Sequence, residues 1–131
     1  MRRSIGMLAI VAIVVMRCAI AAPAACHVRP SERVVLFGFG DDPGVFLWDS
    51  RFRLRAYHAA SFDEAQALLP HALLLAAGTR ALVIRCYGED VQPKYSLRPE
   101  DAVDVRVLTG PDRGSIGWVI GGDIQVMTAK P

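Results

Sequence analysis

Short apolar runs separated by turn-forming residues dominate the chain beyond its first 25 positions. Residues 33–39 and 45–48 are rich in Val, Leu, Phe and Trp and predict two β-strands, joined by a turn of sequence GDDPG. Further on, three arginines alternate with Phe52 and Leu54. This period of two predicts a third, half-buried strand over 52–57.

One helix is predicted. Ser61 is typical of a helix N-cap, and Glu64, three positions later, can bond back to the cap backbone in a capping box. Pro70 disfavours helical geometry in the residue before it, so the helix should end near Leu69. The periodicity of 71–77 fits an extended segment as well as a last helical turn.

From Gly78 onward the pattern is again that of β-strands. A polar loop is expected over 88–101. In the strand before this loop, we expect Leu82, Ile84 and Cys86 to share the inward face. Strands are predicted over 81–87, 103–107, 116–120 and 124–126.

The strand over 103–107 alternates regularly between apolar and charged residues. Its three valines are expected to face inward, because a strand places successive side chains on opposite faces. Asp104 and Arg106 are then expected to face outward.

The first 25 residues follow a different pattern. Arg2 and Arg3 precede an apolar run over 5–16, and small residues follow, in the order of a secretory signal peptide. The run is shorter than the roughly 20 residues that a membrane-spanning helix needs. Cleavage after Ala21 follows an A-x-A motif, and cleavage after 24 or 25 is the alternative. We therefore expect a signal peptide over 1–25 and a secreted or periplasmic protein.

Removal of this segment changes the charge of the chain. The formal net charge is +2, and loss of Arg2, Arg3 and Arg17 leaves −1. A near-neutral domain lacks the electrostatic footprint of a nucleic-acid binder, so no nucleic-acid partner is expected.

Two of the three cysteines lie beyond the predicted signal. Cys26 and Cys86 are 60 positions apart, and in an oxidising compartment they favour one disulfide. A loop of that length could stabilise the fold by roughly 4 kcal/mol. Lipidation of Cys26 is an alternative that Pro23 disfavours, and it is the one route by which we expect a membrane attachment. Free thiols are the third possibility.

The second half carries three motifs: GTRALV at 78–83, a Val-Arg-Val strand at 105–107, and Gly-Trp-Val at 117–119 across a Gly-rich hairpin. With these motifs the stretch 74–126 resembles the bacterial Src-homology-3-like barrels of exported proteins. The resemblance implies a mainly β fold with a small barrel over 74–131. A β-hairpin region and one short helix, over 26–73, would precede the barrel; residues 33–73 lie outside the resemblance.

The titratable residues form no catalytic or metal-binding pattern. His27, His58 and His71 have no zinc-site spacing, so no metal and no cofactor are expected. Cys86 on an inward strand face is inert packing or half of a disulfide. The two aspartates of the GDDPG turn are turn formers. We therefore expect no enzyme.

Arg51, Arg53 and Arg55 are one candidate ligand site. On a strand they would stand about 7 Å apart on one face and suit an anionic ligand. The alternative is the charged face of an edge strand, which keeps other chains from pairing.

Trp118, Tyr87 and Tyr95 are the other candidate surface. The resemblance implies a groove walled by aromatics that binds peptides, with cell-wall peptides as ligands. Alternatively Trp118 points into the core, since Ile116 and Ile120 share its parity.

These observations predict an exported, non-catalytic binding module of the bacterial cell envelope that recognises a peptide, peptidoglycan or a protein partner. The alternative is a structural or accessory subunit of an envelope protein assembly with no small ligand. An exposed Trp118 beside Tyr95 would favour the first of these, and a buried Trp118 the second.

Overall fold

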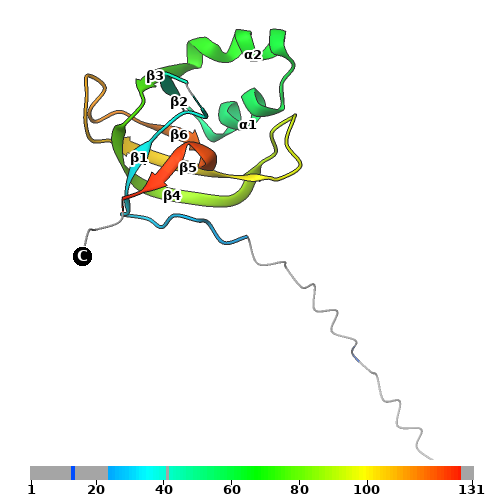
Figure 1. Cartoon of the computed structure of the whole chain (residues 1–131). Helices are drawn as coiled ribbons and strands as arrows, with labels where there is room; N and C mark the ends of the chain where they lie inside the picture. Colours follow the sequence, from blue (N-terminus) through cyan, green and yellow to red (C-terminus); the bar gives the residue numbers. More distant parts are fainter. Residues whose placement is uncertain (1–12, 14–23, 41, 128–131) are drawn as a thin grey trace, which may run out of the picture.

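Seven β-strands pair into one antiparallel sheet that curls into a half-barrel, with two helices against it (Figure 1). The structure is a computed structural model that describes residue 13, residues 24–40 and residues 42–127. The sheet order is β3-β2-β6-β5-β4-β1-β7. The fold is therefore mainly β, as predicted, while the predicted signal peptide falls almost entirely outside the described residues.

The elements follow one another closely along the chain. The strands are β1 (Arg33–Leu36), β2 (Gly44–Trp48), β3 (Ala72–Ala76), β4 (Thr79–Val91), β5 (Glu100–Val107), β6 (Ile116–Ile120) and β7 (Ile124–Val126). The helices are α1 (Arg51–Ala59) and α2 (Phe62–Leu68), with 3-10 turns η1 (Leu69–His71) and η2 (Gly121–Asp123).

The predicted strand over 52–57 is wrong, because these residues belong to α1. Ser50 caps the helix, and its side-chain oxygen accepts a hydrogen bond from the backbone N–H of Arg53 at 3.1 Å. Leu54 is fully buried between α1 and the sheet. Over so few residues, alternation fits a helix with one buried position as well as it fits a strand. The cap and the burial of Leu54 favour the helix.

The helix after Ser61 is confirmed as α2. Its predicted capping box is absent, because the Ser61 side chain makes no cap hydrogen bond. The ambiguous segment over 71–77 forms β3, which pairs with β2. A single 3-10 turn, with Pro70 inside it, leads from α2 into this strand.

A β-bulge in β4 reverses the predicted orientation of its first half. Ile84 has no partner in the register between β4 and β5, which marks the bulge. Ahead of it Val83 faces the core, and beyond it Cys86 packs against the same core. Leu82 is therefore on the opposite face from Cys86, and the prediction that they share the inward face is wrong. The predicted inward position of Cys86 itself is confirmed.

The loop predicted over 88–101 is shorter in the structure, since β4 continues to Val91 and β5 starts at Glu100. The three valines of 103–107 are buried, as predicted. Asp104 points to the face opposite these valines, as predicted, because it lies between Arg85 and Trp118 in the strand register; it is nevertheless buried.

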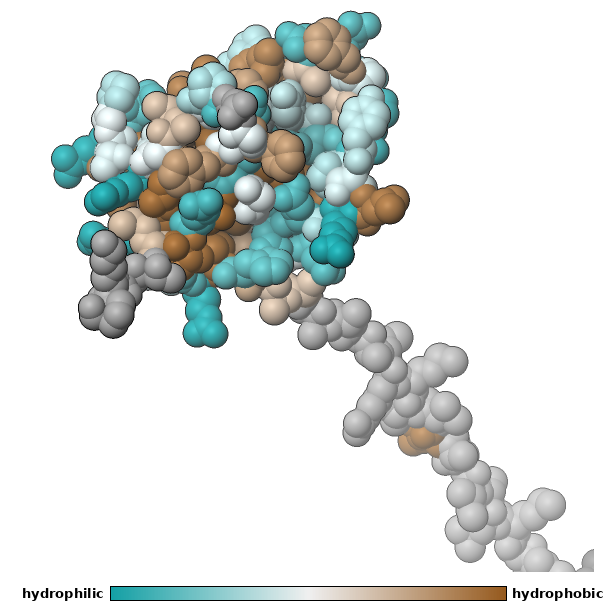
Figure 2. Space-filling view, viewed as in Figure 1, coloured by the Kyte–Doolittle hydropathy of each residue, from teal (hydrophilic) through white to brown (hydrophobic). Residues whose placement is uncertain are grey.

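Two clusters of apolar side chains form the interior. One lies within the curl of the sheet and is built mainly from valines of β1, β4, β5 and β6. The other lies between the sheet and α1, and contains Trp48, Leu54, Val91, Ala102 and Ile120. On the surface in Figure 2, apolar side chains gather near the middle of the face and at its upper rim, with polar side chains among them.

Strand β1 joins the two halves of the chain, because it pairs with both β4 and β7. The predicted disulfide between Cys26 and Cys86 is present, with their Cα atoms 6.2 Å apart. It holds the N-terminal segment against β4 and is compatible with an oxidising, extracytoplasmic location. Within the described ranges, no helix is long and apolar enough to cross a membrane.

Candidate functional site

Four side chains from three elements stack beside one another on the outer face of the sheet. The Arg51 guanidinium lies 3.8 Å from the centroid of the Tyr87 ring, and the Tyr87 and Trp118 rings stack with their centroids 5.8 Å apart. The Arg85 guanidinium lies 5.8 Å from the Trp118 ring. We call Arg51, Tyr87, Trp118 and Arg85 the arginine–aromatic row.

The strand geometry explains why these residues meet. Arg85 and Tyr87 are two positions apart on β4, so both side chains point to the same face. Their cross-strand neighbours on β5 are Asp104 and Ala102, and Trp118 on β6 lies opposite Asp104. The bulge in β4 sets this register, because it moves Arg85 and Tyr87 onto the face that carries Trp118.

One end of the row is held by an ion pair. The Nε atom and a terminal nitrogen of Arg51 donate to the two oxygens of Asp90, at 2.6 and 2.5 Å. These hydrogen bonds hold the pKa of Asp90 below its usual range, against the effect of its burial. Since Arg51 is the first residue of α1, this pair also ties the helix to β4.

The other end of the row is the side chain of Arg85. Arg85 donates through Nε to Asp104 at 2.9 Å, and its side chain is 59 % exposed while that of Asp104 is 4 % exposed. Asp104 has a second oxygen that is buried without a hydrogen-bond partner. No ion pair among the described residues occupies the terminal nitrogens of Arg85, and two such nitrogens suit a carboxylate or phosphate group.

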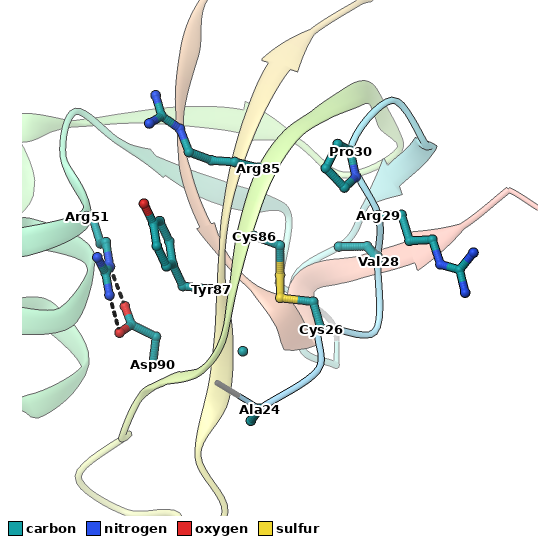
Figure 3. A pocket seen from close by; sticks show the side chains of 11 residues that line it. Ala24, Cys26, Val28, Arg29, Pro30, Arg51, Arg85, Cys86, Tyr87 and Asp90 are labelled. Atoms are coloured by element: carbon teal, nitrogen blue, oxygen red, sulfur yellow. Dashed lines mark hydrogen bonds and ion pairs between the residues drawn. A yellow bond between two sulfur atoms is a disulfide. The ribbon is translucent and has the colours of Figure 1, made fainter. Parts of the chain in front are cut away.

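A cavity of about 560 Å³ opens beside the row. Figure 3 shows that Arg51, Tyr87 and Arg85 form one side of it, while the Cys26–Cys86 disulfide lies on the other. The remaining walls are largely apolar and include Val28, Pro30 and Gly88.

Gly88 is needed where the N-terminal segment crosses β4. A Cβ at this position would collide with the backbone carbonyl of Ala24. The absence of a side chain therefore lets the segment from Ala24 to Val28 form one wall of the cavity.

The other predicted site residues lie elsewhere. Arg53 pairs with Asp49 at 2.5 Å, and Arg55 lines a separate cavity beside α1. Tyr95 is 91 % exposed in the loop between β4 and β5 and lines a third cavity. The three arginines thus do not form a row on a strand, and Tyr95 does not lie in the cavity beside Tyr87. Trp118 is half-buried and packs against the cluster under α1.

Sequence reasoning missed Arg85, Asp90 and Asp104. A signal for Arg85 existed, since it stands two positions before Tyr87 on a predicted strand. Nothing in the sequence indicates that Asp90 meets Arg51, 39 positions earlier, because α1 was expected to be a strand.

A second cleft of about 560 Å³ lies between the β2–α1 region and η2, and it collects titratable groups. Burial of the Asp123 carboxyl, together with the nearby negative charges of Glu100 and Asp42, raises its pKa to about 7. Burial lowers the pKa of His58 to about 4. Among the described residues, no hydrogen bond or ion pair joins the His58 ring to a carboxylate.

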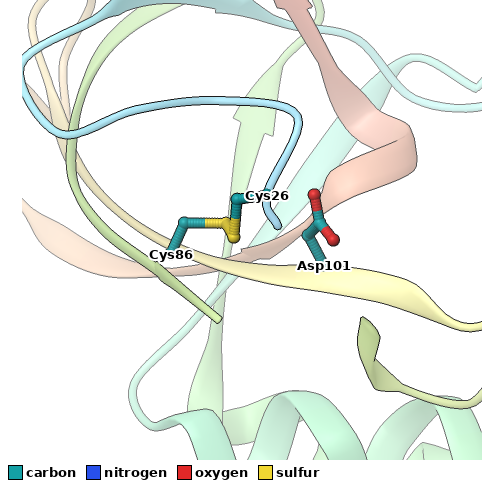
Figure 4. Close-up of side chains that lie close together, drawn as sticks. All are labelled: Cys26, Cys86 and Asp101. Atoms are coloured by element: carbon teal, nitrogen blue, oxygen red, sulfur yellow. A yellow bond between two sulfur atoms is a disulfide. The ribbon is translucent and has the colours of Figure 1, made fainter. Parts of the chain in front are cut away.

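Cys26, Cys86 and Asp101 bring possible metal-ligand atoms within 4.8 Å of one another (Figure 4). Metals bind cysteine as the thiolate, and here both sulfurs are joined in the disulfide. Asp101 accepts hydrogen bonds from the backbone N–H of His27 at 3.0 Å and of Glu89 at 3.1 Å. The cluster is therefore a clamp that fixes the N-terminal segment to β4 and β5.

Comparison of the chain with protein-family models, with curated proteins and with solved structures finds no match. A functional assignment therefore depends on the geometry of the arginine–aromatic row and its cavity.

Proposed function

We propose that this protein is an exported, non-catalytic binding module of the bacterial cell envelope, and that the arginine–aromatic row is its ligand site. The observation that carries the proposal is the stack of Arg51, Tyr87, Trp118 and Arg85 beside an open, largely apolar cavity. Aromatic and arginine side chains are the residues that most often dominate binding energy at recognition surfaces.

The chemistry of the site suits an acidic peptide. The terminal nitrogens of Arg85 can donate two parallel hydrogen bonds to a carboxylate. The cavity beside Tyr87 has room for a small apolar side chain against Val28 and Pro30. Peptidoglycan peptides combine free carboxylates with small apolar side chains, so they are the ligand class we place first. A protein partner with an acidic segment is the second.

The pairing of the strands supports a Src-homology-3-like barrel as the scaffold. β4, β5 and β6 form an antiparallel meander, and β1 bridges β4 and β7 at its side. Short antiparallel strands that follow one another in this way are typical of small barrels, and here they curl into a half-barrel. The barrel then includes β1, which precedes the stretch 74–126, and the region from β2 to β3 is an insertion between β1 and β4.

Export is supported by the disulfide. Structural disulfides persist in oxidising compartments and are rare in the cytosol. The N-terminal pattern of two arginines, an apolar run and small residues is that of a signal peptide.

Co-sedimentation with isolated cell-wall sacculi tests the proposal. The full chain is expressed and purified as the cell processes it, and is compared with Tyr87→Ala and Arg85→Gln. Tyr95→Ala is the matched control, because Tyr95 is an exposed tyrosine outside the cavity. We expect saturable binding by the parent and the control, and about tenfold weaker binding by the two row variants.

Added salt should weaken binding by the parent more than binding by Arg85→Gln, because the variant lacks one charged contact. Absence of parent binding to sacculi would exclude wall peptides. Binding that Tyr87→Ala and Tyr95→Ala reduce equally would contradict the assignment of the site to the row.

A further inference from the structure

The sheet ends on one side in an open edge, the strand β3. β3 is the terminal strand of the sheet, and among the described residues it pairs with β2 alone. Its outer side therefore presents backbone N–H and C=O groups that another strand can pair with. The opposite edge, β7, is only three residues long.

No charge, proline or bulge protects β3 along this edge. Its sequence, ALLLA, contains no charge and no proline, and its register with β2 shows no bulge. Leu73 and Leu74 are 45 % and 61 % exposed. Natural sheets keep open edges from pairing with other chains by charges, prolines or bulges, and β3 has none of these.

The sequence of β3 is also palindromic about Leu74. When two copies pair antiparallel about a twofold axis at Leu74, each Leu74 lies opposite its own counterpart. Each Leu73 then faces Leu75 of the second copy, and each Ala72 faces Ala76. Leucine thus meets leucine and alanine meets alanine, and the strand places no charge opposite another.

We propose that β3 is a homodimerisation edge, at which two copies of this chain join their sheets through antiparallel β3–β3 pairing centred on Leu74. A twofold interface requires a surface that complements itself, and a palindromic uncharged strand meets that requirement. At the two ends of the strand, the Ala72 N–H already donates to the Leu69 carbonyl, and the Ala76 carbonyl already accepts a hydrogen bond from the Thr79 hydroxyl at 2.6 Å. The hydrogen bonds between the two Leu74 residues therefore contribute most to the pairing.

The dimer is a weak one. One pair of five-residue strands buries less than the roughly 1,200 Å² of surface that stable protein interfaces bury. The dimer should therefore form and dissociate with concentration. This interface lies apart from the arginine–aromatic row, and its existence does not depend on the proposed ligand.

Analytical ultracentrifugation of the processed full chain, from micromolar to about millimolar concentration, tests the proposal. The parent should shift from monomer to dimer across this range. Leu74→Lys and Leu74→Glu should each remain monomeric, because like charges would face each other across the axis. An equimolar mixture of the two variants should dimerise again. Leu97→Lys, at a fully exposed loop position, is the matched control and should dimerise as the parent does.

Circular dichroism verifies the fold of each variant, and Leu74→Cys gives a second test that adds no charge. Since position 74 lies opposite itself, this variant should form a disulfide-linked dimer under mild oxidation, and Leu97→Cys should not. A parent that stays monomeric at millimolar concentration would overturn the proposal. Dimerisation that persists in folded Leu74→Lys would overturn it as well.

Discussion

The Arg51 guanidinium stacks on the Tyr87 ring at 3.8 Å while it donates two hydrogen bonds to Asp90. One side chain at the start of α1 therefore contacts two side chains of β4 at once. Because the guanidinium is planar, it can lie against the ring and at the same time donate two hydrogen bonds to one carboxylate. A lysine ammonium in its place could not make both contacts. The contact links the stability of the helix to the shape of the candidate site.

Arg51→Met should lower the free energy of unfolding by about 1–3 kcal/mol. The variant leaves the Asp90 carboxylate, whose side chain is 13 % exposed, without its two donors. Arg53→Met is the matched control. Its partner Asp49 is 44 % exposed and remains solvated without the arginine, so a loss of about 0–1 kcal/mol is expected. Urea unfolding measures both, and equal losses would contradict the role assigned to Arg51.

Reduction of the disulfide should lower the free energy of unfolding by roughly 4 kcal/mol, because the bond closes a loop of 60 residues in the unfolded chain. Urea unfolding with and without a phosphine reductant measures the difference. Cys86→Ser without reductant should match the reduced parent. A variant as stable as the oxidised parent would show that the bond does not constrain the fold.

Asp123→Asn should raise stability at alkaline pH. The pKa of Asp123 is about 7 in the folded protein, against 3.8 for an ordinary aspartate. Between these values the folded state holds a proton that the unfolded state releases. The stabilisation from this group is therefore complete below pH 4 and is lost as the pH rises through 7.

We expect the variant and the parent to be equally stable near pH 4, and the variant to be more stable by about 1–2 kcal/mol at pH 8. This is less than the full shift implies, because the side chain is partly solvated. Urea unfolding from pH 4 to 8 gives the difference at each pH. A constant difference across that range would contradict the assignment to Asp123.

Gly88→Ala should loosen the N-terminal segment, because the added Cβ collides with the Ala24 carbonyl. Backbone cannot move aside cheaply, so a loss of about 1–3 kcal/mol is expected, together with faster deuterium exchange over 24–28. Gly122→Ala is the control, since its Cβ would meet the flexible end of the Glu100 side chain. Unchanged exchange in Gly88→Ala would show that the segment does not depend on this contact.

Several elements could be predicted because their determinants are local. β5 and β6 follow from alternation and Gly-rich turns, and α2 follows from Ser61 and Pro70. The disulfide could be predicted because only two cysteines lie beyond the predicted signal. Among the site residues, Tyr87 and Trp118 were proposed together, and the structure places them in one stack.

The failures have a common physical cause. The pattern of residues over 52–57 is compatible with a strand and with a helix. Burial of Leu54 in the apolar cluster that contains Trp48 favours the helix. This single change separates Arg53 and Arg55 from the candidate site and leaves Arg51 within reach of β4. Propensity differences of tenths of a kcal/mol per residue are too small to decide such a case without tertiary contacts.

The sequence by itself determined that the chain is mainly β, that two cysteines were available to pair, and that Gly-rich turns connect short strands. These properties depend on residue type and on spacing along the chain. Only the tertiary structure decided which residues share a face, because one bulge at Ile84 gives the two halves of β4 opposite alternation. The register beyond the bulge places Arg85 and Tyr87 beside Trp118.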